Sequence, residues 1–571
     1  MMISLSLSVQ RLPTRSPTPA GRPSIDALLA ESVLVAPAAI RFFFPKASLL
    51  ATASDLQGLG PLWALNASQQ KEFWLAMAEW TAVAAVRPWQ VESLDQASLA
   101  VTGVSKGNSH VRTIGGSPVL MNFIPDGGAF QSGGFERATI LHEIGHALGL
   151  KHPFEGNPIL TGVENGAHYT IMSYDSWADG QGRLIGPATP QLYDIQAVQY
   201  LYGANQSYRA GNDVYRWNPN AIIFRCLWDA GGSDTIDASN QPQSVRIDLS
   251  PGSFSRIGRE IVQSVFVADP KGSSTRTTTT TVNGVTTQVV ERGNYVDKRR
   301  RDNLSIAFGA VIENAIGTAF ADELRGNGVA NVLDGRGGDD RLAGGLGNDS
   351  YVFDADTRLG RDVLQETAVA SGGIDTISFR GTSRQTIRLD LATTVVQRVN
   401  DNLQISLAAA EGFENISGGE LGDDLRGNSQ ANVLLGAGGR DLLTGREGKD
   451  LLDGGMGRDT LKGGGDADRF RFTTAPDPLG DCDVITDFSR AQGDRIELDN
   501  AVFPRLPATG ILAATAFRAG TAAITAEQRI LHNRAAGLLS YDPDGKGALA
   551  PLPLARITPG LVLAASCFVV V

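Results

Sequence analysis

Apolar positions around residue 144 follow a helical period. They recur at a spacing of three to four residues, at Ile140, Leu141, Ile144, Ala147 and Leu148. This spacing places them on one face of an α-helix. The sequence therefore predicts a half-buried helix that ends near Gly149, a residue able to adopt positive φ.

A second pattern, between Ser117 and Phe123, is the alternation typical of a β-strand. Val119 and Met121 are its apolar positions, and the turn-forming run Pro125-Asp126-Gly127-Gly128 follows it. Alternation bounded by turn residues predicts a strand.

The third pattern is a nine-residue period in the glycine-rich half of the chain. Glycine begins every unit of two arrays, residues 317–352 and 418–471, and position eight of each unit is Leu, Tyr or Phe. Position six is Asp or Asn. Because a flexible linker would not keep this register, the period predicts the stacked turns of a calcium-loaded parallel β-roll.

Length and composition exclude several classes of protein. A chain of 571 residues is too long for one core, so we expect two or three domains. Its 50 basic and 61 acidic residues give a net charge of −11, which argues against nucleic acid as a partner. Three cysteines cannot form a dense disulfide framework.

We expect no membrane span. The apolar stretch Leu28–Phe44 is interrupted by Glu31, Pro37 and Arg41, and the apolar tail Gly560–Val571 is only twelve residues long. The first residues carry no basic segment, so residues 1–22 are expected to form a leader or propeptide-like tail.

Three histidines on the predicted helix and its exit have the spacing of zinc ligands. His142 and His146 lie one helical turn apart, and His152 follows the turn at Gly149. Glu143 is rotated away from the ligand direction, which favours a role as general base for a zinc-activated water. The alternative is an ordinary amphipathic helix with solvated histidines, and the added Gly and third His argue against it.

A methionine-containing segment, Thr170-Ile171-Met172-Ser173-Tyr174, follows the histidines. Met172 alone would indicate a core residue, but its position after His152 matches the Met-turn of metzincins. The hydroxyl of Tyr174 is predicted to approach the metal or a developing oxyanion.

Carboxylates at position six of the repeats are predicted to flank calcium ions between successive turns. Without the cation they would repel one another across turns about 5 Å apart, so calcium binding should drive folding. The predicted ligands are Asp340, Asp349, Asp441, Asp450, Asp459 and Asp468. Units with a non-glycine residue at position four, namely Phe320, Val329, Leu421 or Gln430, are expected to be degenerate caps.

With these motifs the chain resembles the serralysin-type metzincin proteases that carry RTX repeats. Ile25-Asp26-Ala27-Leu28-Leu29 and the segment from Tyr193 to Asn205 add to the resemblance. It implies that His142, His146 and His152 bind Zn²⁺, that Glu143 is the base, and that Tyr174 is a displaceable ligand. It also implies that Ser117–Phe123 is the edge strand that aligns an extended peptide substrate.

The resemblance implies further calcium ligands where the β-roll begins. They are the backbone at Arg209 and Gly211, with Asp213, Asp229, Gly231, Gly232, Asp234 and Glu313. Gly372, Gly373, Asp375 and Glu414 suggest an equivalent site in a second copy of this region. The first copy is longer, and we place an inserted, exposed hairpin with a tight turn at Asn283-Gly284 between residues 256 and 297.

The predicted fold class is α+β: a zincin-type metalloprotease domain followed by an all-β parallel β-roll, apparently duplicated. The predicted domains are a leader (1–22), the protease (23–205), the β-roll (206–475) and an RTX C-terminal region (476–571). The final residues, Cys567 to Val571, are interpreted as a type I secretion signal or, alternatively, as a buried last strand. His110, His168 and His532 are interpreted as incidental surface or loop residues.

The predicted function is that of a secreted, extracellular, calcium-stabilised zinc endopeptidase acting on protein substrates as a monomer. Its export would use the type I secretion machinery. The alternative is a calcium-dependent binding or adhesive protein with a catalytically idle zinc site.

Overall fold

The computed structural model describes residues 14–15, 20–30, 33–34, 39–52, 62–93, 96–97, 99–104, 110–114, 117–123, 135–174, 177–179, 184–268, 274–282, 285–300, 302–366, 372–476, 482–506 and 509–571. Their contacts form two compact units, one of residues 1–234 and 250–312, the other of residues 235–249 and 313–571. The domain bounds predicted from the sequence motifs differ from the bounds of these two units, and they stay a prediction. Most of the predicted leader lies outside the described residues.

The first unit combines helices with a mixed sheet. Its helices are α1 (Pro23–Asp26), α2 (Ala47–Thr52), α3 (Ala67–Val83), α4 (Phe135–Ala147), η3 (Gly162–Asn165) and α5 (Leu192–Tyr202). The sheet has the order β5-β3-β6-β8-β7, with β4 beside β6. These strands are β3 (Ala39–Phe43), β4 (Leu62–Trp63), β5 (Arg87–Gln90), β6 (Leu99–Val104), β7 (His110–Ile114) and β8 (Ser117–Phe123).

Helix α3 forms because Asn66 and Gln69 close a capping box at its first turn. Trp80, fully buried near its end, donates its indole N–H to the carbonyl of Leu141 in α4. The predicted helix around Ile144 is thus confirmed as α4, and its apolar face packs against α3.

The predicted strand Ser117–Phe123 is confirmed as β8, but its expected place at the sheet edge is wrong. Strand β8 pairs in parallel with β6 on one side and antiparallel with β7 on the other. The alternating pattern predicts a strand without saying which neighbours it has. Among the described strands, β7 is the one at this edge.

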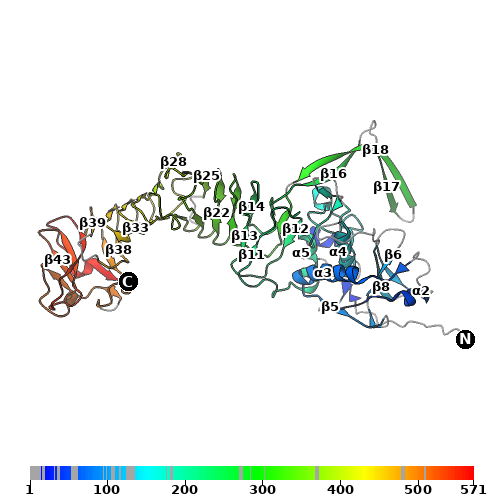
Figure 1. The fold of residues 1–571 in the computed structure, drawn as a ribbon, viewed down its shortest axis with the longest axis horizontal. Coiled ribbons are helices and arrows are strands. Elements are labelled where there is room, and N and C mark those ends of the chain that lie inside the picture. The colour runs from blue at the N-terminus through cyan, green and yellow to red at the C-terminus, as the bar shows by residue number, and fades with distance from the viewer. Residues whose placement is uncertain are drawn as a thin grey trace. The chain divides into compact units, whose positions relative to one another are not determined.

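The insertion forms three strands. The predicted hairpin is confirmed, because β17 (Ser274–Val282) pairs antiparallel with β18 (Val285–Arg300) in a register that joins Val282 to Val285. The turn residues Asn283 and Gly284 lie outside the described residues. Strand β16 (Ile261–Ala268) pairs with β18 (Figure 1). It also pairs with β9 (Trp177–Asp179), which pairs in turn with β10 (Leu184–Ile185).

Short strands complete the first unit. β12 (Arg225–Leu227), β19 (Leu304–Ile306) and β15 (Phe254–Ser255) form a three-stranded sheet. The remaining strands are β1 (Thr14–Arg15), β2 (Val33–Leu34) and β11 (Val214–Tyr215).

The second unit is the β-roll with its C-terminal extension. One continuous sheet follows the order β13-β20-β22-β24-β26-β30-β32-β35-β38-β40-β46-β41. Its strands are β13 (Thr235–Asp237), β20 (Asn314–Ile316), β22 (Val332–Asp334), β24 (Ser350–Val352), β26 (Thr376–Ser378), β30 (Asn415–Ser417), β32 (Val433–Leu435), β35 (Leu451–Asp453), β38 (Arg469–Phe472), β40 (Arg495–Leu498), β41 (Gly510–Ile511) and β46 (Phe568–Val570).

The other strands of the roll belong to two further large sheets and one small one. The first contains β14 (Arg246–Asp248), β21 (Glu323–Arg325), β23 (Arg341–Ala343), β25 (Gly360–Gln365), β28 (Gln397–Arg398) and β29 (Leu403–Leu407). The second contains β27 (Arg388–Asp390), β31 (Asp424–Arg426), β34 (Leu442–Arg446), β37 (Thr460–Gly464), β39 (Asp483–Ile485), β42 (Phe517–Ala519), β43 (Ile530–Asn533), β44 (Leu538–Tyr541) and β45 (Leu552–Arg556). The small sheet pairs β33 (Gly438–Gly439) with β36 (Met456–Gly457), and the short helices are η4 (Ala514–Ala516) and η5 (Ala565–Cys567).

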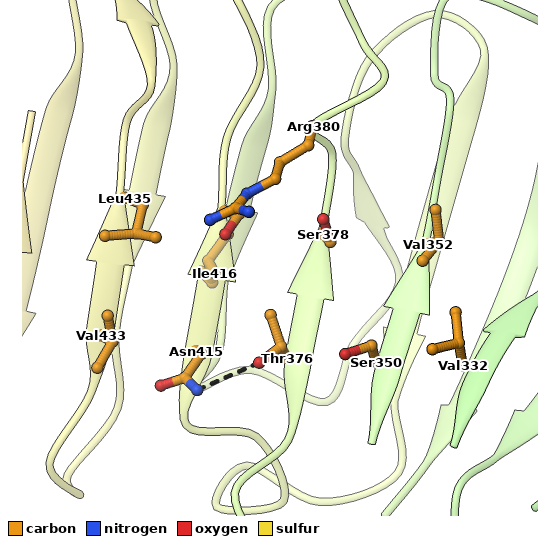
Figure 2. Close-up of a pocket in the computed structure, with 11 residues that line it drawn as sticks. Val332, Ser350, Val352, Thr376, Ser378, Arg380, Asn415, Ile416, Val433 and Leu435 are labelled. Carbon is orange, nitrogen blue, oxygen red and sulfur yellow. Dashed lines mark hydrogen bonds between the residues drawn. The ribbon is translucent and has the colours of Figure 1, made fainter. Parts of the chain in front are cut away.

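The inward-facing column of apolar residues forms the core of the roll, as the nine-residue period predicts. Parallel register stacks position eight of one turn on position eight of another, for example Leu333 on Tyr351 and Leu434 on Leu452. These side chains are fully buried. The outward residues of the same strands leave a depression of about 400 Å³, in which Asn415 donates to Thr376 (Figure 2).

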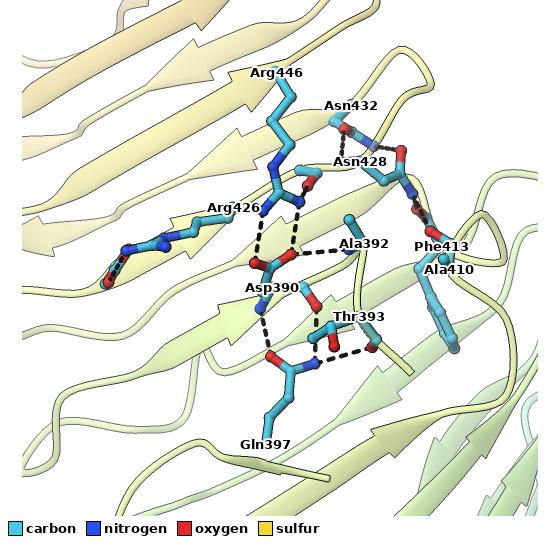
Figure 3. A network of polar contacts seen from close by, with 12 residues as sticks. Asp390, Ala392, Thr393, Gln397, Ala410, Phe413, Arg426, Asn428, Asn432 and Arg446 are labelled. Atoms are coloured by element: carbon cyan, nitrogen blue, oxygen red, sulfur yellow. Dashed lines mark hydrogen bonds and ion pairs between the residues drawn. The ribbon is translucent and has the colours of Figure 1, made fainter. Parts of the chain in front are cut away.

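Polar contacts connect the second array to the strand β27 that precedes it. Arg446 makes a bidentate ion pair with Asp390 and also donates to the carbonyl of Gly427 (Figure 3). Asp390 additionally accepts from the backbone of Ala392. The pair therefore links the last residue of β27 to the last residue of β34.

The C-terminal residues form a buried strand. β46 lies between β40 and β41, and Phe568 is fully buried. This agrees with the predicted last strand, while an export signal in the same residues stays a prediction. Among the described residues, no helix has the length and apolar character needed to cross a bilayer.

Two of the isolated histidines are not surface residues. His168 is 6% exposed and packs against Trp177 and Phe224, and His532 is 1% exposed in β43. His168 lies in a turn, so its interpretation as a loop residue holds but not as a surface residue, and the interpretation of His532 is wrong in both respects. A histidine without a ligand companion can equally be a core residue. His110 lies in β7.

Candidate active site

Three imidazoles converge at the end of α4. His142 and His146 project from consecutive turns of the helix, and the chain reverses at Gly149, whose φ of 93° requires glycine or strain. The Nε2 atom of His152 then lies 3.2 Å from that of His142 and 3.1 Å from that of His146. The three predicted ligands are therefore brought together.

Acceptors on the far side of each ring orient the imidazoles. Nδ1 of His142 lies 2.9 Å from the carbonyl of Ile171, and Nδ1 of His146 lies 2.8 Å from the carbonyl of Leu150. Nδ1 of His152 lies 2.9 Å from the Glu155 carboxylate. Because a carbonyl oxygen can only accept, Nδ1 of His142 and Nδ1 of His146 carry the proton, and the Nε2 lone pairs of these two rings face His152.

The facing lone pairs of His142 and His146 cannot satisfy each other, and a cation that accepts nitrogen ligands resolves the arrangement. Burial, followed by the neighbouring His146, lowers the pKa of His142 to about 3. Burial also lowers the pKa of His146 to about 4. Both rings are thus neutral near pH 7, as metal ligation requires.

Glu143 lies beside the three rings without joining them. Its side chain is 3% exposed, and its Oε2 has no hydrogen-bond partner among the described residues. Burial raises the pKa of Glu143 to about 8. A carboxyl group with this pKa can take up and return a proton near neutral pH.

The turn that contains Met172 packs against α4 between two of the predicted ligands. Met172 is fully buried, and a Cβ added to Gly145 would lie 2.6 Å from its sulfur, so glycine at this position lets Met172 pack against the helix between the two ligands. The carboxylate of Asp194 in α5 fixes this turn, because it accepts from the backbone N–H of Ile171 and from the hydroxyl of Thr170. The carbonyl of Ile171 in turn orients His142.

Tyr174 stands at the open side of the site. Its ring is 65% exposed, yet its hydroxyl lies 2.7 Å from Nε2 of His152. Burial of the hydroxyl, with the nearby Glu143 and Glu155, raises the pKa of Tyr174, so the phenol keeps its proton. Residues 175 and 176 lie outside the described residues.

The first predicted calcium cluster is assembled within the first unit. Oxygen atoms of Asp213, Asp229 and Asp234 lie within 4.8 Å of one another. The backbone turns predicted to join them are close: a Cβ on Gly232 would lie 2.2 Å from the carbonyl oxygen of Gly211. Gly231 has a φ of 137°, and Arg209 pairs with Asp213. Glu313 belongs to the second unit.

The position-six carboxylates of the roll form ladders along the stacked turns. One oxygen of each accepts from the backbone of the turn before it, as Asp441 does from Asp423 N–H and Asp459 does from Asp441 N–H. The second oxygen has no hydrogen-bond partner among the described residues in five of the predicted ligands, Asp340, Asp349, Asp441, Asp450 and Asp468. Buried, unpartnered carboxylate oxygens fit a hard cation.

In the units expected to be caps, the position-six side chains have hydrogen-bond partners within the protein. The second carboxylate oxygen of Asp322 accepts from the backbone N–H of Thr318, and that of Asp423 accepts from the backbone N–H of Gly419. Asn331 and Asn432 carry amides that donate to the carbonyls of Glu313 and Glu414. These side chains are satisfied within the protein, which agrees with a capping role.

Some residues of these sites were not predicted. Asp362 continues one ladder by accepting from Asp340 N–H, and its Oδ2 has no partner among the described residues. Its distance from Asp340 in sequence breaks the nine-residue period, so only the carboxylate itself could have indicated it. Glu366 forms a further cluster with Asp349 and Asp375.

Two family models match parts of the chain. The serralysin C-terminal region of peptidase family M10 matches residues 193–270. The RTX calcium-binding nonapeptide repeat matches residues 316–351, 417–452 and 435–470. The chain is serralysin-like.

Curated proteins agree with this similarity over part of their length. Serralysin of Proteus mirabilis is 35% identical over 226 residues, which are 35% of this chain and 37% of that protein. Metalloprotease AprA of Pseudomonas entomophila (strain L48) is 34% identical over 229 residues, with 35% and 39% covered. Serralysin C of Dickeya chrysanthemi is 43% identical over 147 residues, with 22% and 30% covered. The matched region therefore spans less than two fifths of each of these relatives.

Among solved structures, the AlgE6R3 subunit of the Azotobacter vinelandii mannuronan C5-epimerase is similar to this serralysin-like chain. The identity is 30%, the match covers 26% of this chain and 78% of that one, and the TM-score is 0.19.

Proposed function

We propose that this serralysin-like chain is a secreted, calcium-stabilised zinc endopeptidase. The observation that carries the proposal is the convergence of three imidazoles, His142, His146 and His152, with their Nε2 atoms facing one another. Imidazole nitrogens in this number and arrangement fit Zn²⁺ with one coordination position left open.

When bound, Zn²⁺ would activate a water molecule and polarise the scissile carbonyl. Glu143 takes up the proton of the attacking water and passes it to the leaving amine, for which its raised pKa suits it. Tyr174, still protonated, donates its hydroxyl to the oxyanion that develops on the substrate. Met172 and Asp194 keep the ligand His142 in position.

The calcium ligands stabilise the roll rather than act in hydrolysis. We assign this role to Asp340, Asp349, Asp441, Asp450, Asp459 and Asp468, with Arg209, Gly211, Asp213, Asp229, Gly231, Gly232, Asp234 and Glu313. The protease is of the zincin type and the roll is duplicated. The corresponding pairings of β13 with β20 and of β26 with β30 support this duplication.

The serralysin likeness and the RTX repeats support extracellular localisation and protein substrates. The chain leaves the cell unfolded through type I secretion machinery and folds where calcium reaches about 10⁻⁴ to 10⁻³ M. It acts as a monomer.

The test is the variant Glu143→Gln. We expect casein hydrolysis to fall by at least about 10³-fold, because the carboxylate that moves the proton is lost. Zinc content, measured after gel filtration, should stay at one ion per chain. Unchanged activity would exclude the mechanism, and a zinc-loaded wild type that cleaves no protein would favour the calcium-dependent binding protein instead.

A further inference from the structure

An exposed aromatic ring lies against one of the three imidazoles of the candidate active site. Phe154 follows His152 by two residues and is 39% exposed. Its ring stacks on the imidazole of His152, with centroids 5.0 Å apart and planes inclined by 5°. Phe154 therefore contacts a predicted zinc ligand, while much of its surface stays open to solvent.

The same ring contacts Tyr174, the exposed residue at the open side of the site. The two ring centroids are 5.1 Å apart. The Tyr174 hydroxyl lies 2.7 Å from Nε2 of His152, the nitrogen that faces the other two imidazoles. Phe154 and Tyr174 thus form two adjoining apolar surfaces beside the place where a scissile carbonyl would meet the metal.

The loop that carries this exposed ring is closed by its own hydrogen bonds. The carbonyl of Pro153 accepts from the N–H of Leu160 at 2.7 Å, which joins the two ends of the loop. Nζ of Lys151 donates to the carbonyls of Glu155 and Pro158. A substrate would therefore meet an ordered surface, and little conformational entropy would be lost when it binds.

This loop exposes a second large apolar side chain. Ile159 is 47% exposed and directly precedes Leu160, whose backbone bond to Pro153 returns the chain to the start of the loop. Leu160 itself is 4% exposed and anchors the loop. Single exposed apolar residues are common on protein surfaces, but several of them beside one site mark a place where a ligand binds.

An extended peptide at this site must pass the ring of Phe154. Its residues are about 3.3 Å apart along the backbone, while the rings of Phe154 and His152 are 5.0 Å apart. A substrate side chain close in sequence to the scissile carbonyl therefore reaches the exposed surface of Phe154. Aromatic rings pair with one another through offset or edge contacts and bury large apolar area.

Charged groups next to Phe154 in the sequence are engaged within the loop. The Glu155 carboxylate lies 2.9 Å from Nδ1 of His152, and the amine of Lys151 is bound by two backbone carbonyls. The part of this surface that is left for a ligand is apolar. An aromatic or large aliphatic side chain therefore fits it better than a charged one.

We propose that Phe154 determines the specificity of the candidate active site. Its exposed ring binds an aromatic or large aliphatic side chain of the substrate, within about two residues of the scissile bond. The inference rests on the proposed endopeptidase and adds the chemical class of residue that it selects. Because Phe154 acts by direct contact, it contributes nothing to peptides with a small residue at that place.

Cleavage of matched fluorogenic peptides by the full-length, zinc- and calcium-loaded protein tests the proposal. The peptides share one sequence, and Phe, Leu, Ala or Lys is placed in turn at each position close to the scissile bond. At one of these positions, kcat/KM for the Phe and Leu peptides should exceed that for the Ala peptide by about tenfold or more. Phe154→Ala should remove this preference by slowing cleavage of the Phe and Leu peptides, while the Ala peptide is cleaved as before.

Matched variants check the role of the ring. Phe154→Tyr keeps an aromatic ring and should keep the preference. Phe308→Ala makes the same substitution at a phenylalanine of similar exposure, 38%, in the turn after β19, and should leave every rate unchanged. Zinc content and circular dichroism in millimolar calcium check that each variant folds.

Peptide binding to Glu143→Gln separates this proposal from the proposed hydrolysis. By fluorescence anisotropy, the zinc-loaded variant should bind the Phe peptide about tenfold more tightly than the Ala peptide. Adding Phe154→Ala should remove the difference. If the wild type cleaves no peptide but this difference is found, the peptidase assignment fails and the apolar site stands.

Three results would overturn the proposal. If the wild type cleaves all four peptides at the same rate, the site does not select an apolar side chain. If Phe154→Ala slows every peptide equally, Phe154 only positions His152 through their stack. If the Lys peptide is preferred, the ring and Glu155 select a cation instead.

Discussion

Asp194 illustrates how a single residue away from the three imidazoles controls their geometry. Its fully buried carboxylate accepts from the backbone N–H groups of Ile171 and Gln191 and from the hydroxyl of Thr170. The carbonyl of Ile171 orients His142, so the chain of contacts runs from α5 through the Met172 turn to a zinc ligand. Asp194 is a positioning residue by this argument.

We expect Asp194→Asn to loosen the zinc site. The amide keeps the size of the carboxylate but places an NH₂ group against at least one of three donors, which costs about 1–3 kcal/mol. The melting temperature should fall, and zinc should transfer faster to a chromogenic chelator. The exposed Asp401→Asn serves as control. Zinc transfer at the wild-type rate would show that the turn holds its position without this carboxylate.

The columns of the nonapeptide repeats illustrate what sequence can predict at the residue scale. Each position-six aspartate in a consensus unit was predicted, because a fixed period determines which side chains stack. Asp362 and Glu366 were not predicted, because the turns that bring them beside the same carboxylate ladders differ in length from the nine-residue repeat. The burial of His168 and His532 was not predicted, because burial depends on distant contacts, such as those of His168 with Trp177 and Phe224.

At the scale of elements, strand β16 joins the insertion to a buried core of the first unit. Ile261, the first residue of β16, is fully buried in a cluster with Ala167, Trp177, Ile185 and Phe224. Trp177 begins β9, three positions after Tyr174 in the sequence. The insertion therefore contributes to the core that holds the chain just beyond the candidate active site.

Replacing Ile261 with alanine should destabilise the first unit by about 2–5 kcal/mol, because a large buried side chain leaves a cavity. The measurement is denaturant unfolding in saturating calcium, followed by tryptophan fluorescence. Ile159→Ala, at a position 47% exposed, should cost much less. An equal loss in both variants would contradict the anchoring role of β16.

Helix α4, the hairpin of β17 and β18, and the stacked strands of the roll were predictable because their signals are local: a period, a turn or a repeat. The neighbours of β8 were not predictable. Strand order depends on which segment pairs next in the sheet, and β7 pairs with the side of β8 that was expected to be an open edge. Pairing of β16 with β9 was equally beyond the sequence, since it joins segments far apart in the chain.

At the scale of the whole molecule, the roll buries stacked carboxylates that repel one another when they are ionised and no cation is bound. Burial, with neighbouring carboxylates, raises the pKa of Asp340 and of Asp441 to about 8 and that of Asp468 to about 7. In the unfolded chain such groups titrate near 3.9. The folded, calcium-free roll thus binds protons that the unfolded chain releases.

The sign of the resulting pH dependence is fixed. A group whose pKa is raised by folding stabilises the folded state fully below its unfolded pKa, and this contribution is lost as pH rises through the folded value. In excess EGTA the melting temperature of the roll should therefore fall steadily between pH 5 and pH 8. Calcium binding must displace the retained protons, so calcium affinity should rise over the same interval.

Scanning calorimetry at several pH values, with and without calcium, measures both trends. In saturating calcium the fall in melting temperature should disappear, because the bound ions neutralise the ionised carboxylates. Asp441→Asn removes one titrating group and one ligand together, so it should flatten the pH dependence in EGTA while lowering the stabilisation by calcium. A calcium-free roll that gains stability from pH 5 to pH 8 would contradict the buried ladders as the origin of calcium dependence.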